Sequence, residues 1–227
     1  MQKKSLILVS GGMDSGVLCS IAAQTKDELY FLHLNYHNKT HIKELSCFRK
    51  LCTHFNIPAE RQKIIDLAFL KDIGSSSLTD SSIEVSDFSE ISLQGEIPSS
   101  YVPFRNSIIL SLAVSWAESI GIRSIYIGAN EEDSPGYPDC RQSYYDCFNQ
   151  LIKQGTKEGD IQILTPLISL MKKEIVEQGN QLHTPFEHTW SCYKEADIAC
   201  GKCDSCVLRL KGFAQNDLKD PIDYQKD

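Results

Sequence analysis

SLILVSGGMDSGVL, residues 5–18, is the stretch that decides the fold. Residues 5–9 form a continuous apolar run, which is typical of a strand buried on both faces of a parallel sheet. Ser10, Gly11 and Gly12 end that run, and residues 15–24 carry apolar side chains at the spacing of an amphipathic helix. A buried strand, a glycine turn and a helix in direct succession predict the first unit of an α/β fold.

The same alternation of strand and helix continues along the chain. Apolar segments at 29–34, 64–67 and 124–128 predict further strands, and helical spacing covers 41–55 and 107–120. Strands that alternate with helices at this length favour parallel pairing, with helices on both faces of the sheet. The predicted class is therefore α/β, a Rossmann-like parallel sheet flanked by helices, with a small appendage at its C-terminal end.

Two segments depart from this pattern. Residues 71–100 are rich in serine and poor in large apolar side chains, so we expect a long surface loop or lid there. Residues 186–227 are short, polar and rich in cysteine, which is typical of a small segment stabilised by a metal ion. The predicted division is an α/β domain at 1–185 and a cysteine-rich segment with its tail at 186–227.

Composition narrows the classes of function. The chain has 227 residues and a formal net charge of −7, whereas a general grip on nucleic acid needs a basic face, so no stable nucleic-acid partner is expected. The run at 6–9 is too short for a signal-peptide core or a membrane span, and no other stretch approaches membrane length. We therefore expect a cytoplasmic protein without a membrane partner.

The turn at 10–15 has the features of an anion-binding loop. Its two glycines let the backbone approach a ligand, and the helix that follows presents unpaired N–H groups. Asp14 suits a Mg²⁺ ligand, and the alternative is a plain turn in which Asp14 or Ser15 caps the helix. The residues predicted to surround bound phosphates are Leu8, Val9, Ser10, Gly11, Gly12, Met13, Asp14, Ser15, Gly16, Val17 and Leu18.

Four of the nine cysteines are grouped near the C-terminal end. Cys200, Cys203 and Cys206 lie within seven residues, and Cys192 is a short loop away. In a reducing compartment this spacing predicts metal binding and argues against disulfides. Four thiolates close a tetrahedral shell around Zn²⁺ and leave no position for water, so we expect one structural zinc ion; an iron–sulfur cluster is the alternative.

Polar residues between these motifs are candidates for the same site. Arg105 precedes a predicted helix and can bind phosphate or a carboxylate, although a capping or ion-pair role suits it as well. Lys172 can face a growing phosphoryl charge, although lysines on helices are usually solvated.

The chain after the fourth predicted strand carries a second group of candidates. Asn130 ends that strand, where open α/β sheets bind their ligands. Tyr137 can stack on a planar heterocycle, Asp139 can accept hydrogen bonds from a guanine-like edge, and Arg141 can neutralise a carboxylate. The alternative is a rigid proline and glycine turn with an Asp–Arg surface pair.

Six motifs taken together resemble one family. They are SGGMDS at 10–15, YVPFRN at 101–106, GAN with SPGYPDCR at 128–141, TPL with K-x-E at 165–174, TWSCY at 189–193 and CGKCDSCVLR at 200–209. In this order they resemble the 7-cyano-7-deazaguanine synthase family over residues 5–213. The first motif by itself resembles the wider superfamily of pyrophosphatase-loop ATP enzymes, whose domain is adenine nucleotide α-hydrolase-like.

The resemblance implies an ATP-dependent C–N ligase of queuosine precursor biosynthesis. Such an enzyme converts 7-carboxy-7-deazaguanine and ammonia into 7-cyano-7-deazaguanine through an adenylated intermediate. It implies ATP at the loop, a zinc ion on the four grouped cysteines, and a homodimer, while Mg²⁺ is expected from the carboxylate of Asp14. From the chemistry of the residues we infer that Asp14, Ser15, Arg105 and Lys172 are catalytic and that Asn130, Tyr137, Asp139 and Arg141 bind the substrate.

The chain departs from the family pattern at His37 and Asn38, where many members carry glycine and glutamine. Histidine restricts the backbone and asparagine is a shorter amide, so nucleotide contacts or substrate choice are expected to differ. Three alternatives stay open: an enzyme that attaches a deazaguanine to a protein or nucleic acid, a tRNA-modifying member of the superfamily, and a zinc-ribbon binding module. The α/β pattern that precedes the cysteines is too long for a bare zinc ribbon.

Overall fold

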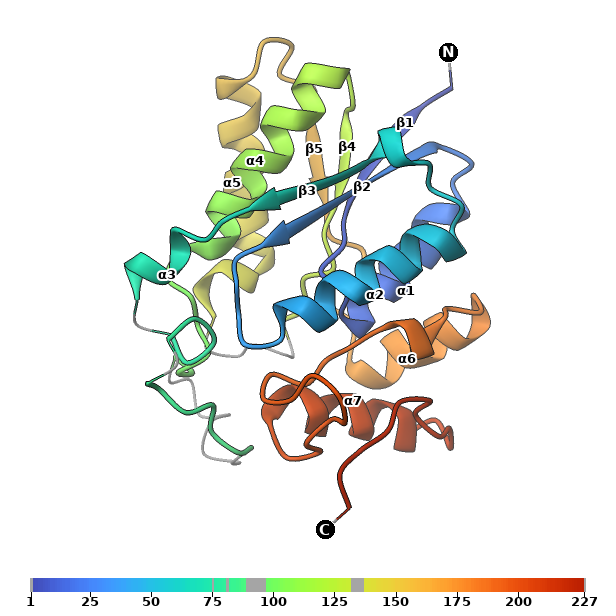
Figure 1. The fold of residues 1–227 in the computed structure, drawn as a ribbon. Coiled ribbons are helices and arrows are strands. Elements are labelled where there is room, and N and C mark those ends of the chain that lie inside the picture. The colour runs from blue at the N-terminus through green and yellow to red at the C-terminus, as the bar shows by residue number, and fades with distance from the viewer. Residues whose placement is uncertain (1, 75, 81, 89–96, 132–136, 227) are drawn as a thin grey trace.

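A sheet of five parallel strands forms the centre of the computed structural model, which describes residues 2–74, 76–80, 82–88, 97–131 and 137–226 (Figure 1). The strands are β1 Lys4–Leu8, β2 Glu28–Asn35, β3 Gln62–Asp66, β4 Ser124–Tyr126 and β5 Gln162–Leu164. They follow the order β3-β2-β1-β4-β5 across the sheet. Because every neighbouring pair is parallel, the carboxyl ends of all strands lie along one edge.

Helices cover both faces of this sheet (Figure 1). They are α1 Met13–Ala23, α2 His41–His54, α3 Leu70–Ile73, α4 Arg105–Ile120, α5 Gln142–Gly155, α6 Lys172–Gln181 and α7 Asp204–Ala214. Single 3-10 turns occur at Ala59–Arg61, Pro138–Cys140 and Phe186–His188. The predicted α/β class, a Rossmann-like parallel sheet flanked by helices, is confirmed.

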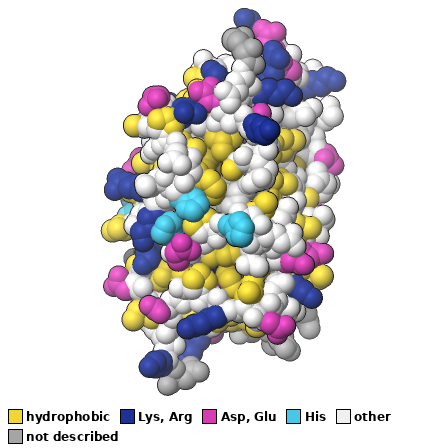
Figure 2. Space-filling view, turned by 90° about the vertical axis from the view of Figure 1, so that its right-hand side faces the viewer, with side chains coloured by type: hydrophobic (Ala, Val, Ile, Leu, Met, Phe, Trp, Pro, Cys, Tyr) yellow, Lys and Arg dark blue, Asp and Glu magenta, His cyan; other side chains and the backbone are white. Residues whose placement is uncertain are grey.

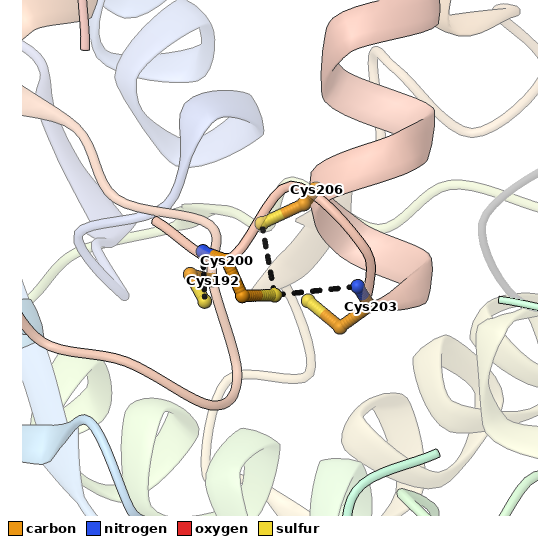
Figure 3. A group of neighbouring side chains, drawn as sticks. All are labelled: Cys192, Cys200, Cys203 and Cys206. Atoms are coloured by element: carbon orange, nitrogen blue, oxygen red, sulfur yellow. Dashed lines mark hydrogen bonds between the residues drawn. The ribbon is translucent and has the colours of Figure 1, made fainter. Parts of the chain in front are cut away.

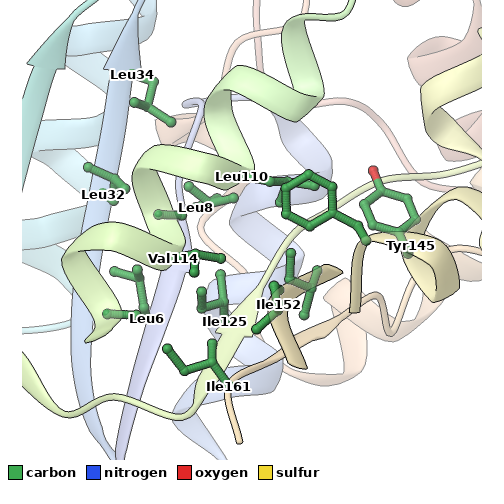
Figure 4. Close-up of a cluster of buried hydrophobic side chains, with 14 of the residues drawn as sticks. Leu6, Leu8, Leu32, Leu34, Leu110, Val114, Ile125, Tyr145, Ile152 and Ile161 are labelled. Atoms are coloured by element: carbon green, nitrogen blue, oxygen red, sulfur yellow. The ribbon is translucent and has the colours of Figure 1, made fainter. Parts of the chain in front are cut away.

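Side chains of β1 alternate between two hydrophobic cores. Leu6 and Leu8 belong to the core that α4 and α5 cover, which Figure 4 shows. Ile7, together with Val9 just beyond the strand, belongs to a second core with side chains of α1, α2 and α6. Both faces of β1 are therefore buried, which explains why residues 5–9 read as one continuous apolar run.

The sequence pattern described the burial of one strand incorrectly and did not predict another. β3 is an edge strand, and Ile64 is 45% exposed although its segment reads as buried. β5 has three residues, and the apolar pattern is too short there to stand out from its surroundings. The parallel partner of β4 was consequently absent from the predicted elements.

The serine-rich segment is less exposed than its composition predicted. Ser76, Ser77 and Leu78 are buried, so the prediction of a surface loop is wrong for these residues. Backbone hydrogen bonds satisfy this segment: Ser77 donates to the Ser99 carbonyl at 2.8 Å. A serine can be buried at small cost when its polar groups are bonded in this way. The rest of the predicted loop includes residues 89–96, which lie outside the described part of the chain.

The surface mixes charges of both signs. Figure 2 shows the side of the molecule that lies to the right in Figure 1, where Lys and Arg alternate with Asp and Glu around exposed apolar groups. Within the described residues, no helix is both long enough and apolar enough to cross a bilayer.

A buried ion pair holds the parts of the C-terminal segment together. Arg209 of α7 is 1% exposed and binds both oxygens of Asp220, at 2.7 and 2.9 Å. The same guanidinium donates to the Thr189 hydroxyl at 2.9 Å and to the Phe186 carbonyl at 3.2 Å. The Tyr224 hydroxyl donates to Asp220 from the tail. One guanidinium thus joins α7, the chain near residue 189 and the tail.

We expect Arg209→Met to lower the free energy of unfolding by about 3–5 kcal/mol, because the substitution leaves the carboxylate of Asp220 buried without its partner. Arg123→Met is the matched control, since Arg123 pairs with Asp160 at 2.6 Å but is 72% exposed. Breaking that surface pair should cost at most about 1 kcal/mol. Denaturant unfolding of both variants measures the difference, and equal losses would contradict a stabilising role for the buried pair.

Candidate active site

The turn after β1 has no room for a side chain at Gly11. Its φ of +93° lies where glycine is favoured, and a Cβ there would come within 2.5 Å of the Glu44 carbonyl oxygen in α2. Trp190, from the C-terminal segment, donates its backbone N–H to the Gly11 carbonyl at 2.8 Å. Glycine at this position therefore lets one turn contact both α2 and the chain near residue 190.

Helix α1 begins at this turn without a side-chain cap. Gly12 is the N-cap residue, and the Ser15 hydroxyl donates to its carbonyl at 2.9 Å. The Ser10 hydroxyl donates to the Ser15 hydroxyl at 3.2 Å. The alternative in which Asp14 or Ser15 caps the helix is therefore wrong. Anion-binding loops use an uncapped helix start, because the first backbone N–H groups of the helix can then donate hydrogen bonds to a ligand.

An ion pair joins the loop to α6. Lys172, the first residue of α6, places its Nζ 2.6 Å from Asp14 Oδ2, and these side chains are 8% and 17% exposed. The other carboxylate oxygen of Asp14 is buried and has no hydrogen-bond partner among the described residues. The fold thus brings together two predicted catalytic residues that are 158 positions apart in the sequence.

A cavity of about 290 Å³ lies beside this ion pair, at the carboxyl edge of the sheet. Its volume is near the lower end of the range for small-molecule sites. The predicted site residues that line it are Leu8, Val9, Ser10, Gly12, Met13, Asp14, Ser15, Arg105, Asn130, Tyr137 and Lys172. The predicted site residues outside its lining are Gly11, Gly16, Val17, Leu18, Asp139 and Arg141.

Gly16, Val17 and Leu18 of α1 fall outside the cavity lining because they pack elsewhere. Val17 and Leu18 are fully buried in the second core. Gly16 lies against Thr189, whose methyl carbon would come within 2.7 Å of an added Cβ. These residues hold α1 in place, and the side chains that can reach a ligand come from the loop itself.

Arg105 lines the cavity from the first turn of α4. Its guanidinium lies over the ring of Tyr36, 5.0 Å from the centroid, and donates to the Tyr36 hydroxyl at 3.2 Å. Burial raises the pKa of Tyr36, so this hydroxyl stays protonated at neutral pH. Arg105 Nε is buried and has no partner within the described part of the chain. The arginine is held by an aromatic ring and keeps one donor for another group.

The departure at His37 and Asn38 is accommodated by the structure. His37 has a φ of +57°, the left-handed conformation that glycine adopts most readily. Its Nε2 lies 2.8 Å from Asp66 Oδ2, and this contact lowers the pKa of Asp66. Asn38 donates to Glu44 Oε1 at 2.5 Å and to the Tyr36 hydroxyl at 3.2 Å. The two residues keep a glycine-like turn and fix the side chains behind Arg105.

The fold places only some of the candidate residues between 130 and 141 in the cavity lining. Tyr137 lines the cavity, and its hydroxyl is hydrogen-bonded to Ser100. Asn130 also lines the cavity, but its amide donates to the Leu167 carbonyl at 3.1 Å and so braces the backbone after β5. Residues 132–136, between these two, lie outside the described part of the chain.

Asp139 and Arg141 lie outside the cavity lining. Asp139 is 4% exposed, and its carboxylate accepts the backbone N–H of Asn106 at 3.3 Å. The Asn106 amide donates to the Asp139 carbonyl at 3.0 Å, so Asp139 anchors the start of α4. Arg141 is exposed and precedes α5 as its N-cap residue. Burial raises the pKa of Asp139, which is the expected effect on a carboxyl group held in the protein interior.

Several lining residues were absent from the sequence-based candidates. Among them are Tyr36, Glu44, Trp190, Ser191, Tyr193, Asp204, Ser205, Leu208 and Arg209. The last seven belong to the C-terminal segment, where the cysteine spacing was the dominant signal. Their presence means that this segment supplies one wall of the cavity in addition to its cysteine cluster.

The four grouped cysteines point toward one another (Figure 3). The sulfur atoms of Cys192, Cys200, Cys203 and Cys206 all lie within 4.8 Å of one another, and all four residues are buried. Backbone N–H groups donate to two of the sulfurs at 3.3–3.4 Å, a contact that stabilises thiolates. The cluster could therefore hold a metal ion, as the spacing predicted.

The chain closely resembles known proteins over nearly all of its length. It matches the family described as queuosine biosynthesis protein QueC over residues 4–217. A 7-cyano-7-deazaguanine synthase from Chlorobium phaeobacteroides is 53% identical over 98% of this chain and 97% of that protein. A 7-cyano-7-deazaguanine synthase from Chlorobaculum parvum is 52% identical over 98% of this chain and 96% of that protein.

Among solved structures, NMN synthetase from Francisella tularensis aligns with 87% of this chain and 67% of that chain, at 18% identity and a TM-score of 0.49.

We expect Gly11→Ala to destabilise the protein more than Gly74→Ala does. Both glycines have positive φ, but an added Cβ at Gly74 meets nothing within 4 Å. The control should therefore lose about 1 kcal/mol of unfolding free energy from backbone strain alone, while Gly11→Ala should lose about 2 kcal/mol more as the turn shifts away from α2. Thermal unfolding measures both, and indistinguishable losses would show that the contact with Glu44 adjusts freely.

Proposed function

The chain belongs to the queuosine biosynthesis protein QueC family, and on this premise we propose that it makes 7-cyano-7-deazaguanine from 7-carboxy-7-deazaguanine, ammonia and ATP. The observation that carries the proposal is the 53% identity to a 7-cyano-7-deazaguanine synthase over 98% of the chain. The cavity supports it, because the SGGMDS loop, Lys172 and Arg105 all line one space.

The chemistry needs a good leaving group on carbon. A carboxylate is a poor electrophile, so one of its oxygens attacks the α-phosphate of ATP, and pyrophosphate leaves. Ammonia then attacks the carbonyl carbon, the amide forms, and AMP leaves with that oxygen. Activation of the amide oxygen by a second ATP lets the nitrile form as a second AMP departs with the remaining oxygen. The enzyme positions the reactants and stabilises phosphate charge.

The loop and Lys172 are suited to that task. The N–H groups at the start of α1 can donate hydrogen bonds to phosphate oxygens, and the ammonium group of Lys172 is buried at the same place. A positive charge near the α-phosphate favours the transition state, where negative charge grows on the phosphoryl oxygens. Arg105 offers a second cation from α4.

Mg²⁺ is part of the proposal at Asp14. One carboxylate oxygen of Asp14 pairs with Lys172 and the other is a buried oxygen without a partner among the described residues. Carboxylate oxygens are ligands that Mg²⁺ prefers, and this ion usually completes its shell with waters and substrate phosphates. When bound, the ion would supply positive charge to the phosphates.

The metal proposed for the cysteine cluster is Zn²⁺. Four thiolates that converge within a buried site fit a tetrahedral zinc ion and leave no open position. Such an ion would fix the start of α7 and the chain at Cys192, two residues after Trp190, whose backbone N–H binds the loop. Its role would be structural.

A free small-molecule substrate is preferred to a nucleic-acid or protein acceptor. The net charge is −7, and the face in Figure 2 carries no continuous basic surface. We include in the proposal a cytoplasmic location, which the short apolar runs of the sequence favour, and a homodimer, which the family resemblance implies.

Turnover of 7-carboxy-7-deazaguanine with ATP and ammonia should give the nitrile, detected by mass spectrometry together with AMP. Lys172→Met should lower kcat by about 100-fold or more, the usual cost of removing one group that stabilises transition-state charge. Lys173→Met is the matched control, because this neighbouring side chain is exposed and should leave kcat unchanged. If the wild-type protein forms no nitrile, or if it transfers the deazaguanine to tRNA or protein, the proposed function is wrong.

Purified protein should contain one zinc ion per chain by elemental analysis. Cys203→Ser should lose the ion and unfold at a lower temperature, because one of four thiolates in a closed shell is removed. Cys147→Ser should keep the ion, since Cys147 is exposed and lies outside the cluster. If the wild-type protein contains iron and acid-labile sulfide, the cysteines bind an iron–sulfur cluster and the zinc proposal is wrong.

A further inference from the structure

Buried polar atoms without partners are concentrated at the cavity. Among the described residues they are Asp14 Oδ1, Asn38 Oδ1, Arg105 Nε, the Tyr145 hydroxyl and Asp204 Oδ1. Three of these residues, Asp14, Arg105 and Asp204, line the cavity. Most buried polar atoms in proteins are hydrogen-bonded, so this concentration points to a polar ligand that supplies the missing bonds. Asp14 belongs to the phosphate loop, and the other two are not yet explained.

Asp204 is the first residue of α7 and directly follows Cys203. An acidic residue in the first turn gains a small stabilisation from the helix dipole, which is the ordinary explanation for such a position. The helix dipole does not explain why Asp204 lines a cavity. It also does not explain why one carboxylate oxygen of Asp204 is buried without a hydrogen-bond partner among the described residues. The cost of leaving a buried acceptor unsatisfied exceeds the gain from the dipole.

Arg105, Tyr137 and Asp204 all line the cavity. Burial raises the pKa of Tyr137, and the charges of Arg105 and Asp204 act on the same hydroxyl in opposite directions. The cavity thus has two polar regions. The first is the phosphate loop with Lys172, and the second combines a donor on Arg105, an acceptor on Asp204 and the ring of Tyr137.

The second region matches the hydrogen-bonding edge of guanine. That edge presents the acceptor O6 beside two donors, N1–H and the 2-amino group. A carboxylate can accept from both donors at once, and an arginine N–H can donate to O6. In 7-carboxy-7-deazaguanine, the reacting carboxylate and the 2-amino group lie at opposite ends of the bicyclic ring. A substrate with its carboxylate at the phosphate loop would therefore offer its guanine edge to a separate polar region.

We propose that Asp204 binds N1–H and the 2-amino group of the deazaguanine ring, with Arg105 Nε donating to O6. This inference rests on the proposed function and deepens it by naming the residue that selects a guanine-like base. Asp139 does not take this role, because its carboxylate binds the Asn106 backbone and lies outside the cavity lining. A site built around a buried acceptor rejects a substrate that lacks the matching donor.

The test compares 7-carboxy-7-deazaguanine with its 2-desamino analogue, which keeps the carboxylate and N1–H. We expect wild-type kcat/KM to favour the natural compound by about 100-fold or more, since the analogue leaves the acceptor partly unpaired. Asp204→Asn should reduce this preference at least about tenfold, mainly through a higher KM for the natural compound, because its amide group offers one acceptor and one competing donor. The KM for ATP should be unchanged.

Asp139→Asn is the matched control and should keep the wild-type preference whatever it does to stability. The inference is wrong if Asp204→Asn keeps the wild-type preference for the natural compound over the 2-desamino analogue. It is also wrong if only Asp139→Asn loses that preference. A wild-type protein that converts neither compound would contradict the proposed function itself, and the inference with it.

Because Asp204 adjoins Cys203, zinc content and thermal unfolding are measured for each variant. Should Asp204→Asn fail to fold, a crystal structure of the wild-type protein with 7-carboxy-7-deazaguanine decides the question. Hydrogen bonds from N1 and the 2-amino group to Asp204 support the inference, and contacts of that edge with any other side chain overturn it.

Discussion

The absence of space at Gly11 is the constraint on which the site depends. The backbone after β1 passes so close to α2 that a Cβ would come within 2.5 Å of a carbonyl oxygen, and on its other side it accepts a hydrogen bond from Trp190. A bulkier turn would separate β1, α2 and the C-terminal segment. Because all three meet there, the uncapped start of α1, the ion pair of Asp14 and the cysteine-rich wall surround one cavity.

The parts of the fold that the sequence made predictable are those with local causes. The apolar run at 5–9 and the glycine turn are consecutive residues whose periodicity and backbone freedom can be read directly. The cysteine cluster is equally local, because C-x₂-C spacing places sulfurs on one side of a turn whatever surrounds it. β5 was missed because its three residues show no pattern, and its pairing with β4 is a property of the sheet.

The parts of the site that could not be predicted depend on contacts between distant segments. Nothing near Lys172 in the sequence indicates that it pairs with Asp14, 158 residues away. Asp139 has the chemistry to bind a guanine edge, yet the fold uses it to anchor α4. Asp204 was hidden within a cysteine motif, and its exposure to the cavity follows only from the packing of α7. The type of a residue determines which chemical roles it can take, and its tertiary contacts determine which of these roles it has in the fold.

The hydrogen bond between Trp190 and Gly11 also has a consequence for synthesis on the ribosome. The loop at 10–15 is translated well before the residues that complete its surroundings, which lie at 190 and beyond. Contacts between such distant parts of a chain form late and slow the folding of a domain. A nascent chain therefore lacks a complete cavity until the residues from 190 onward have been made, and a ligand of the cavity can stabilise the fold only after that point.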